Sequence, residues 1–262
     1  MNVYRLWANV NNYRILLPVA GRVIDHYRCF NGMPLEDPSE ALPVMFELEN
    51  ADTPVGDFPG LTSHIPVFSR RGAEVLGGWV SASGDLVSLR CRDCDDAYVG
   101  LNVTRLVDAL DEDRSRVKRF RSGRIMRILR HTFVAEKLRD AAIFKIPETA
   151  VQDVYVRYPF VAAVVDSGLR GFVFELLWTD ASFLILCPYC LGIIEAATET
   201  CPTCGLDTRR DAPWEVTPDE LFEMKMWRCP VCGVRIRQAS DPCPYCKQGE
   251  RRQGGRTGVV IV

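Results

Sequence analysis

Eight cysteines in the C-terminal third of the chain have the spacing of metal ligands. They form four Cys-x-x-Cys pairs: Cys187 and Cys190, Cys201 and Cys204, Cys229 and Cys232, and Cys243 and Cys246. The last two pairs repeat the first two at an offset of 229 − 187 = 42 residues, as in a duplicated module. Two such pairs that face each other offer four thiolates to one ion, which is the tetrahedral ligand set that Zn²⁺ accepts.

Each group of four cysteines leaves no ligand position for water, so we expect structural rather than catalytic ions. The sequence thus predicts two structural Zn²⁺ ions, one bound within residues 187–204 and one within residues 229–246. Four disulfides are the alternative interpretation. Against this alternative, cysteines so close in sequence form strained disulfides, and the N-terminal apolar run contains arginine and asparagine, unlike a secretory signal peptide.

Other residues could also bind a metal ion. Cys91 and Cys94 form a fifth Cys-x-x-Cys pair without a second cysteine pair, and His26 and Cys29 show the same i, i+3 spacing. These four residues are either a third metal site or ordinary buried and loop side chains. The aspartates within residues 93–96 either bind a cation or belong to a solvated loop.

The sequence lacks a recognisable catalytic motif. It contains no GxSxG, phosphate-binding loop or HExxH, and His64 and His131 have no carboxylate at a telling spacing. We therefore predict that the protein is not an enzyme and has no catalytic residues.

Composition predicts a globular protein of more than one domain. The chain has 262 residues, of which 47% are hydrophobic and 25% charged. No apolar run reaches the roughly eighteen residues of a membrane-spanning helix, and the predicted thiolate sites need a reducing compartment. We expect a soluble, cytoplasmic protein. The formal net charge of −2, about −6 with both zinc sites filled, argues against a dedicated nucleic-acid-binding protein.

An N-terminal domain is predicted over residues 1–180. Apolar runs of strand length occupy residues 3–6, 13–17, 44–48, 86–89, 98–103, 116–120, 124–133, 143–146, 154–156 and 172–178. Three helices are expected: one after Ser69 with Val75, Leu76, Trp79 and Val80 on its inner face, a short one at residues 106–110, and one from Pro159 to Gly168. Many short strands without βαβ alternation predict an α+β fold with a mixed, largely antiparallel sheet.

Residues 181–262 are predicted to form a tandem zinc-ribbon module. Its two cysteine groups are joined by a helix over residues 218–227, which begins at the capping box of Thr217 and Glu220.

A strongly basic run lies in the middle of the predicted N-terminal domain. Residues 114–130 contain eight lysines or arginines among seventeen residues and no acidic residue. The run could bind nucleic acid, or contact an acidic partner protein, or be the solvated face of a hairpin. In the last case five apolar residues would enter the core: Val117, Phe120, Ile125, Ile128 and Leu129.

Five segments in the N-terminal domain carry a family resemblance. They are GDFPGLTSHIPVFSRR (56–71), NVTRLVDALD (102–111), RFRSGRIMRI (119–128), IFKIPE (143–148) and GLRGFVFELLW (168–178). In this order they resemble the myxobacterial-type immunity protein family of bacterial polymorphic toxin systems. The resemblance implies a protein that binds and neutralises a cognate toxin, without catalytic residues of its own. The cysteine module lies outside the resemblance, as a C-terminal extension.

Two functions are therefore carried forward. The first is an immunity protein with structural zinc sites in its C-terminal module. The alternative is a zinc-ribbon nucleic-acid-binding regulatory protein that uses the basic run. The identity of the toxin, the surface that binds it and the oligomeric state are not specified by the sequence.

Overall fold

The fold is taken from a computed structural model. It describes residues 1–19, 27–38, 45–49, 52–92, 97–187, 192–194, 198–201, 207–208, 214–223, 227–228, 235–236, 252–253 and 259–261. The chain divides into two compact units, residues 1–178 and residues 179–261. The first unit is α+β with few helices and mostly antiparallel sheets, which confirms the predicted class of fold.

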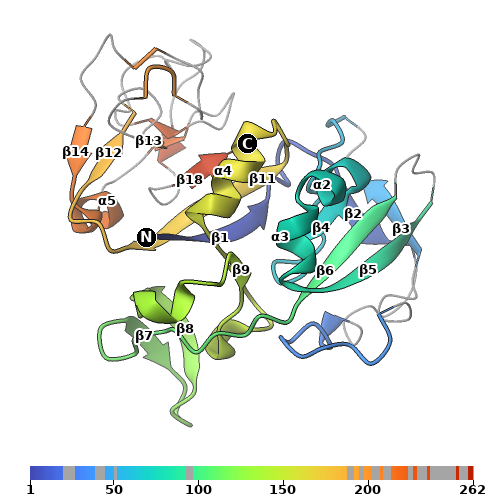
Figure 1. Cartoon of the computed structure of the whole chain (residues 1–262), viewed down its shortest axis with the longest axis horizontal. Helices are drawn as coiled ribbons and strands as arrows, with labels where there is room; N and C mark the ends of the chain where they lie inside the picture. The colour runs from blue at the N-terminus through green and yellow to red at the C-terminus, as the bar shows by residue number, and fades with distance from the viewer. Residues whose placement is uncertain are drawn as a thin grey trace. The chain divides into compact units, whose positions relative to one another are not determined.

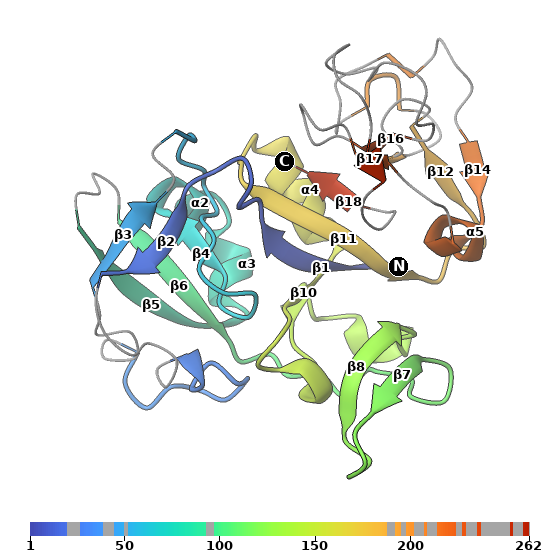
Figure 2. The ribbon, with the colours of Figure 1, turned by 180° about the vertical axis from the view of Figure 1, so that it is seen from behind.

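The first sheet of the N-terminal unit contains β11, β1, β10 and β9 in this order. Their bounds are Phe172–Thr179, Asn2–Ala8, Tyr155–Arg157 and Ile143–Phe144. The helix α4 (Tyr158–Asp166) covers one face of this sheet (Figures 1 and 2). Its buried side chains are Phe160, Val161 and Val164, and it ends before Gly168, whose φ of 62° favours glycine. The predicted helix and its stop signal are thus confirmed.

The second sheet has the order β2-β3-β5-β6-β4. These strands span Ile15–Pro18, Met45–Glu49, Gly84–Cys91, Tyr98–Val103 and Val67–Ser69. All neighbours are antiparallel except β3 and β5, which run parallel. Two short helices, α2 (Arg70–Val75) and α3 (Gly77–Ser81), cover one face of this sheet (Figure 1).

The predicted helix after Ser69 is therefore interrupted. Ser69 is the N-cap, and its hydroxyl accepts a hydrogen bond from the Gly72 amide at 3.0 Å. The chain leaves helical geometry at Leu76, before two glycines that have poor helix propensity. Leu76 and Val80 are buried as predicted, whereas Val75 is 48% exposed. The prediction that Val75 lies on the inner face is wrong, because that face is formed by Gly72, Leu76 and Val80 at intervals of four residues.

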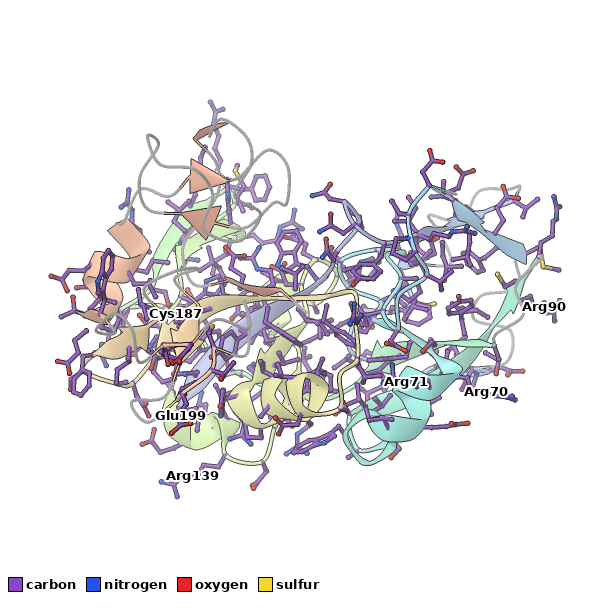
Figure 3. The ribbon with its side chains drawn as sticks, turned by 90° about the horizontal axis from the view of Figure 1, so that it is seen from above. Arg70, Arg71, Arg90, Arg139, Cys187 and Glu199 are labelled. Carbon is purple, nitrogen blue, oxygen red and sulfur yellow. The ribbon has the colours of Figure 1, made fainter. Side chains whose placement is uncertain are left out.

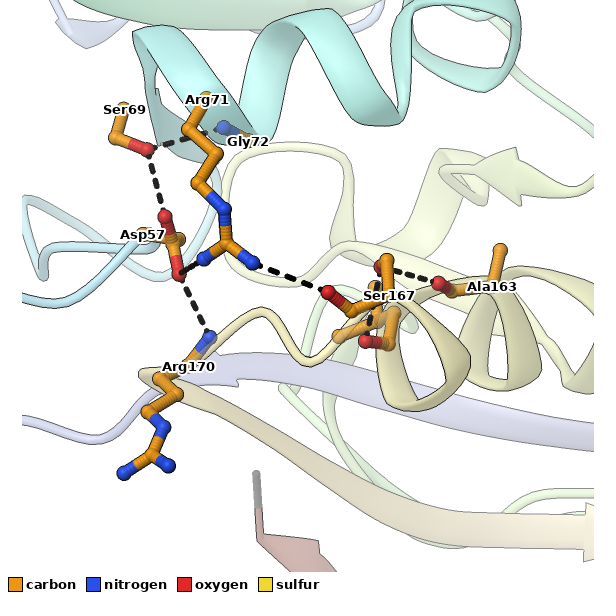
Figure 4. A network of polar contacts seen from close by, with 8 residues as sticks. Asp57, Ser69, Arg71, Gly72, Ala163, Ser167 and Arg170 are labelled. Atoms are coloured by element: carbon orange, nitrogen blue, oxygen red, sulfur yellow. Dashed lines mark hydrogen bonds and ion pairs between the residues drawn. The ribbon is translucent and has the colours of Figure 1, made fainter.

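A polar network joins the start of α2 to the segment after α4 (Figure 4). The carboxylate of Asp57 accepts from Ser69 Oγ at 3.1 Å, from Arg71 Nη1 at 3.0 Å and from the Arg170 amide at 2.9 Å. Arg71 also donates to the carbonyl of Ser167 at 3.1 Å. One partly buried carboxylate thus connects the layers that cover the two sheets.

A separate antiparallel hairpin completes the N-terminal unit. It consists of β7 (Arg116–Arg119) and β8 (Ile125–Arg130), with Gly123 at a φ of 83° in the connection. Two 3₁₀ helices follow, η1 (Ala135–Leu138) and η2 (Pro147–Thr149). The hairpin was predicted from the sequence, and the structure confirms it.

The predicted short helix at residues 106–110 is wrong. Leu106 forms a parallel bridge to Lys145, and Leu110 forms an antiparallel bridge to Phe133. The Val107 amide donates to the Lys145 carbonyl at 2.8 Å. These hydrogen bonds to residues distant in sequence satisfy the backbone groups that a helix would have paired locally.

The C-terminal unit contains two sheets with the same arrangement. Their orders are β13-β12-β14 and β16-β15-β17. Their strands span Leu184–Leu186 (β12), Ile193–Ile194 (β13), Trp214–Val216 (β14), Trp227–Arg228 (β15), Arg235–Ile236 (β16) and Arg252–Gln253 (β17). A further short strand, β18, spans Val259–Ile261. Ile185 pairs with Ile194 in the first sheet, and Trp227 pairs with Ile236 in the second. Both partners are displaced by 42 residues (227 − 185 and 236 − 194), so the repeat in sequence is also a repeat in strand register.

The helix between the two sheets is shorter than predicted. It spans Pro218–Glu223 (α5), and Trp227 belongs to β15 rather than to the helix end. The capping box is confirmed, because the Thr217 amide donates to Glu220 Oε2 at 2.7 Å and the Glu220 amide donates to Thr217 Oγ1 at 3.2 Å. Among the described residues, no helix has both the length and the apolar composition that crossing a bilayer requires.

Candidate functional site

The register of the β7–β8 hairpin contains two irregularities. Val117 pairs with Ile128 and Lys118 with Arg127, while the outer pairs are Arg116 with Arg130 and Arg119 with Ile125. Two residues of β8, Met126 and Leu129, therefore have no paired residue on β7 and are passed over in the register. Each is the extra residue of a β-bulge, a device that redirects side chains and bends a strand.

The two bulges change the burial pattern of β8 from a period of two to a period of three. Ile125 and Ile128 are buried, at 8% and 5% exposure, and both pack in the hydrophobic cluster that includes Phe133. Met126 and Leu129 are instead 36% and 44% exposed. The expectation that Leu129 enters the core is wrong, because it follows the buried Ile128 and adjacent residues of a strand face opposite sides.

Phe120 was also expected in the core, and it is 42% exposed. The guanidinium of Arg124 lies over its ring at 5.1 Å. Phe120 directly follows β7 and adjoins the hairpin connection, so it lies beyond the strand residues that pack on the cluster. Val117 is partly buried against that cluster, as predicted.

A cleft of about 580 Å³ lies between this hairpin and strand β1. The residues that line it include Arg5 and Trp7 of β1 and Lys118, Met126, Arg127 and Leu129 of the hairpin. Both passed-over residues of β8 therefore face the cleft. Sequence reasoning found the basic residues but missed Arg5 and Trp7, because only the tertiary fold brings β1 beside the hairpin.

Arg5 is fixed within the cleft by acidic and aromatic neighbours. It forms ion pairs with Asp153 at 3.4 Å and with Glu175 at 3.7 Å. Its guanidinium lies 5.2 Å from the centre of the Trp7 ring, within the range of cation–π attraction. These contacts compensate the charge of Arg5 and hold Trp7, which is 40% exposed, in one orientation.

Lys118 and Arg127 supply positive charge to the cleft. They are exposed Cα partners on adjacent strands. In the part of the chain that the structure describes, neither forms an ion pair. By contrast, Arg119 is paired with Glu112 and also donates to the Gly123 carbonyl at 2.9 Å. The basic run is thus not uniform, since only part of it faces the cleft.

The buried histidine beneath the cleft is part of an aromatic cluster. His131 is 5% exposed, and its ring lies 5.7 Å from Phe133 and 5.8 Å from Tyr155. Tyr155 shares a hydrogen bond of 2.8 Å with Thr149. Burial, and then the charge of Asp153, raises the pKa of Tyr155 far above its ordinary value, so this hydroxyl stays protonated.

The other candidate histidine, His64, is also held by neutral partners. Its Nε2 donates to the Tyr27 carbonyl at 3.0 Å, and its Nδ1 accepts from Thr62 Oγ1 at 3.1 Å. Burial lowers the pKa of His64, so the neutral ring is favoured.

The structure reveals a buried lysine that the sequence analysis did not identify. Lys145 is 0% exposed, and its Nζ donates to the Phe30 carbonyl at 2.5 Å. Burial lowers the pKa of Lys145 to about 8. Alternation in the predicted strand 143–146 could have identified it, because Lys145 shares a strand face with Ile143.

Two of the eight predicted zinc ligands lie in the described part of the C-terminal unit. Cys187 and Cys201 are both buried at 0% exposure, and Cys187 directly follows β12 (Figure 3). The Cys187 amide donates to the Gly192 carbonyl at 2.8 Å, which closes the connection between β12 and β13. The other six predicted ligands lie outside the described residues: Cys190, Cys204, Cys229, Cys232, Cys243 and Cys246.

The cysteine pairs recur at matching positions in the order of the strands. In the sequence, the first pair lies between the residues of β12 and those of β13, and the third pair lies between the residues of β15 and those of β16. The second pair lies between Thr200 and Asp207, which form an antiparallel bridge. Hairpin connections that hold paired cysteines are a usual setting for structural zinc.

The third metal site proposed from the sequence receives no support from the described residues. Cys29 and Cys91 both pack against the hydrophobic cluster of the second sheet. Burial raises the pKa of the Cys29 thiol. His26, Cys94 and the aspartates of 93–96 lie outside the described residues.

Comparison with known proteins gives a match to an immunity protein family. The model of the immunity protein family (Imm11) matches residues 92–177, about a third of the chain. No curated protein matches the sequence. Four of the five segments that carry the resemblance lie within or overlap the matched range, and residues 56–71 precede it. The matched range contains β6 to β10, α4 and most of β11. The segment that builds the β7–β8 hairpin is therefore similar to an immunity protein family.

Proposed function

We propose that this protein is an immunity protein that binds a cognate bacterial toxin and neutralises it stoichiometrically in the cytoplasm. The observation that carries the proposal is the similarity of residues 92–177 to an immunity protein family. The protein acts by binding, either by covering the active site of the toxin or by holding the toxin in an inactive conformation.

The chemistry of the cleft supports a protein partner. Trp7, Met126 and Leu129 offer apolar and aromatic surface, and Lys118 and Arg127 offer charge beside it. Aromatic, methionine and arginine side chains are enriched where proteins bind one another. A nucleic-acid groove would place cations along a phosphate track, whereas this cleft also contains the carboxylate of Asp153.

We further propose that two Zn²⁺ ions hold the C-terminal unit. The support comes from the repeated spacing of the cysteines, from the complete burial of Cys187 and Cys201, and from the shared strand register of the two sheets. The first ion takes the cysteines of residues 187–204 and the second takes those of residues 229–246. Bound zinc supplies cross-links between short strands and no chemistry on a substrate.

Co-production with the toxin tests the function. The probe is a candidate toxin chosen from the genes beside this one and produced in a host that it kills. Protection by the wild-type protein, together with recovery of a one-to-one complex from the cells, is the expected result. A control variant, Leu76→Asp, places a charge at a fully buried position and should lose protection through misfolding. Failure of the soluble wild-type protein to protect or to bind the toxin would refute the proposed function.

A further inference from the structure

We infer that the cleft between β1 and the β7–β8 hairpin binds an acidic segment of the toxin that carries an apolar side chain beside its carboxylates. This inference rests on the proposed function and names the surface that performs it. The residues that carry it are Trp7, Lys118, Met126, Arg127 and Leu129.

The backbone of β8 points to a binding surface. A regular strand with the sequence IMRILR would alternate between core and solvent, which would place Ile125 and Ile128 on opposite faces. The bulge at Met126 allows both isoleucines to pack in the core. Met126 and Leu129, the two residues passed over by the pairing, line the cleft, where each remains more than a third exposed. Exposed apolar side chains in a concave site favour contact with another molecule.

The distribution of charge selects an acidic occupant. Arg5 is already paired with Asp153 and Glu175, so it organises the cleft without adding net charge. Lys118 and Arg127 lie beside each other on adjacent strands and have no ion-pair partner among the described residues. Carboxylates of a partner would supply the missing counter-charge and would steer the encounter. The apolar residues next to these cations provide the desolvated centre that makes such pairs effective.

A charge-reversal pair with a matched control tests the assignment. The variant Lys118→Glu/Arg127→Glu should weaken binding of the adjacent-gene toxin on the order of 100-fold. The control Arg116→Glu/Arg121→Glu makes the same change in net charge on the same hairpin, at two exposed positions that do not line the cleft. The control should change the affinity less than about 5-fold. Binding is measured by calorimetry with an inactivated toxin, and the thermal midpoint of each variant verifies its fold.

A second pair tests the apolar part of the cleft. Leu129→Ala should weaken binding about 10-fold, since it removes a side chain that contacts the partner. Leu86→Ala is the control, because Leu86 is 45% exposed, as against 44% for Leu129, and lies on β5 outside the cleft. Leu86→Ala should leave the affinity unchanged.

Each outcome has a distinct meaning. Equal loss in the cleft variant and its charge-matched control would overturn the assignment and leave only a general electrostatic attraction. Wild-type affinity in both cleft variants would overturn it and place the toxin on another surface, while the proposed function would stand. No binding by the wild-type protein would overturn the proposed function and the assignment together. Sub-micromolar RNA binding that the cleft variant abolishes, or self-association that Leu129→Ala abolishes, would replace the toxin with that occupant.

Discussion

The β7–β8 hairpin and the β12–β13 hairpin differ in what holds them together. In the first, Ile125 and Ile128 are anchored in a hydrophobic cluster that includes Val3, Phe133 and Leu177. In the second, the antiparallel pairing of β12 with β13 comprises two residue pairs, and its connection begins at a buried cysteine. When buried side chains stabilise a hairpin, its exposed side chains are available to bind a partner. A hairpin with so little pairing needs a cross-link, which we propose is zinc.

Removing the metal should have the largest effect on this difference between the two hairpins. Chelation should unfold the C-terminal unit, and Cys201→Ser should unfold the part of it that contains the first group of cysteines, because structural zinc contributes on the order of 10 kcal/mol to the folding of small zinc-binding units. Residues 1–178 should remain folded. Metal analysis should find two zinc ions in the wild-type chain and fewer in Cys201→Ser. Limited proteolysis reports which unit has unfolded.

The control for this experiment is Cys29→Ser, since Cys29 lies in the N-terminal unit against the second hydrophobic cluster. It should retain both ions. A wild-type protein with almost no zinc, or with four disulfides by mass, would contradict the proposed metal sites.

Alanine variants of two adjacent residues of β8 test how much burial stabilises the β7–β8 hairpin. Ile128→Ala should lower the free energy of unfolding by about 2–4 kcal/mol, because it empties volume in the core. Leu129→Ala should change it by less than about 0.5 kcal/mol, because this side chain is 44% exposed. Urea denaturation of both variants provides the measurement. Equal losses would show that the bulges do not separate a structural residue from a binding residue.

The pH dependence of stability provides a smaller test in the same unit. The folded state holds the pKa of Lys145 at about 8, whereas an unfolded lysine titrates near 10.4. The unfolded chain therefore binds this proton more tightly, so the free energy of unfolding should rise as the pH increases from about 8 to about 10. The gain should be about 2 kcal/mol at most.

Lys145→Met should lack this rise, and Lys137→Met, which removes an exposed lysine, should keep it. The pH dependence of the free energy of unfolding is compared between each variant and the wild type. This comparison is needed because burial also raises the pKa of Cys29 and of Tyr155. These groups oppose the trend once the pH passes their unfolded pKa values. Parallel pH profiles for the wild type and Lys145→Met would show that the amine is not buried as described.

The sequence predicted the elements that depend on local signals. Apolar runs located the strands of both sheets except β4, where no strand was predicted. The Ser69 cap began α2, and the Thr217 capping box began α5. The errors fall where long-range contacts override local preference. The segment at residues 106–110 bridges to distant strands instead of forming a helix, and β8 contains bulges that its apolar pattern does not reveal.

The candidate site was predictable only in part, for a related reason. The basic residues of the hairpin are contiguous in sequence, so composition alone identified them. Arg5 and Trp7 are more than a hundred residues from Arg127, and no local pattern predicts that the fold places them around one cleft. Lys145 escaped notice because an isolated lysine in a strand usually points to solvent.

By itself, the sequence determined the metal-ligand spacing, the duplication at an offset of 42 residues and the basic run, because each is a pattern of neighbours along the chain. The tertiary structure decided which of the basic residues face a cleft and which are already paired. It also decided which apolar residues of β8 are exposed, because the register of a strand depends on the partner and the core against which it packs.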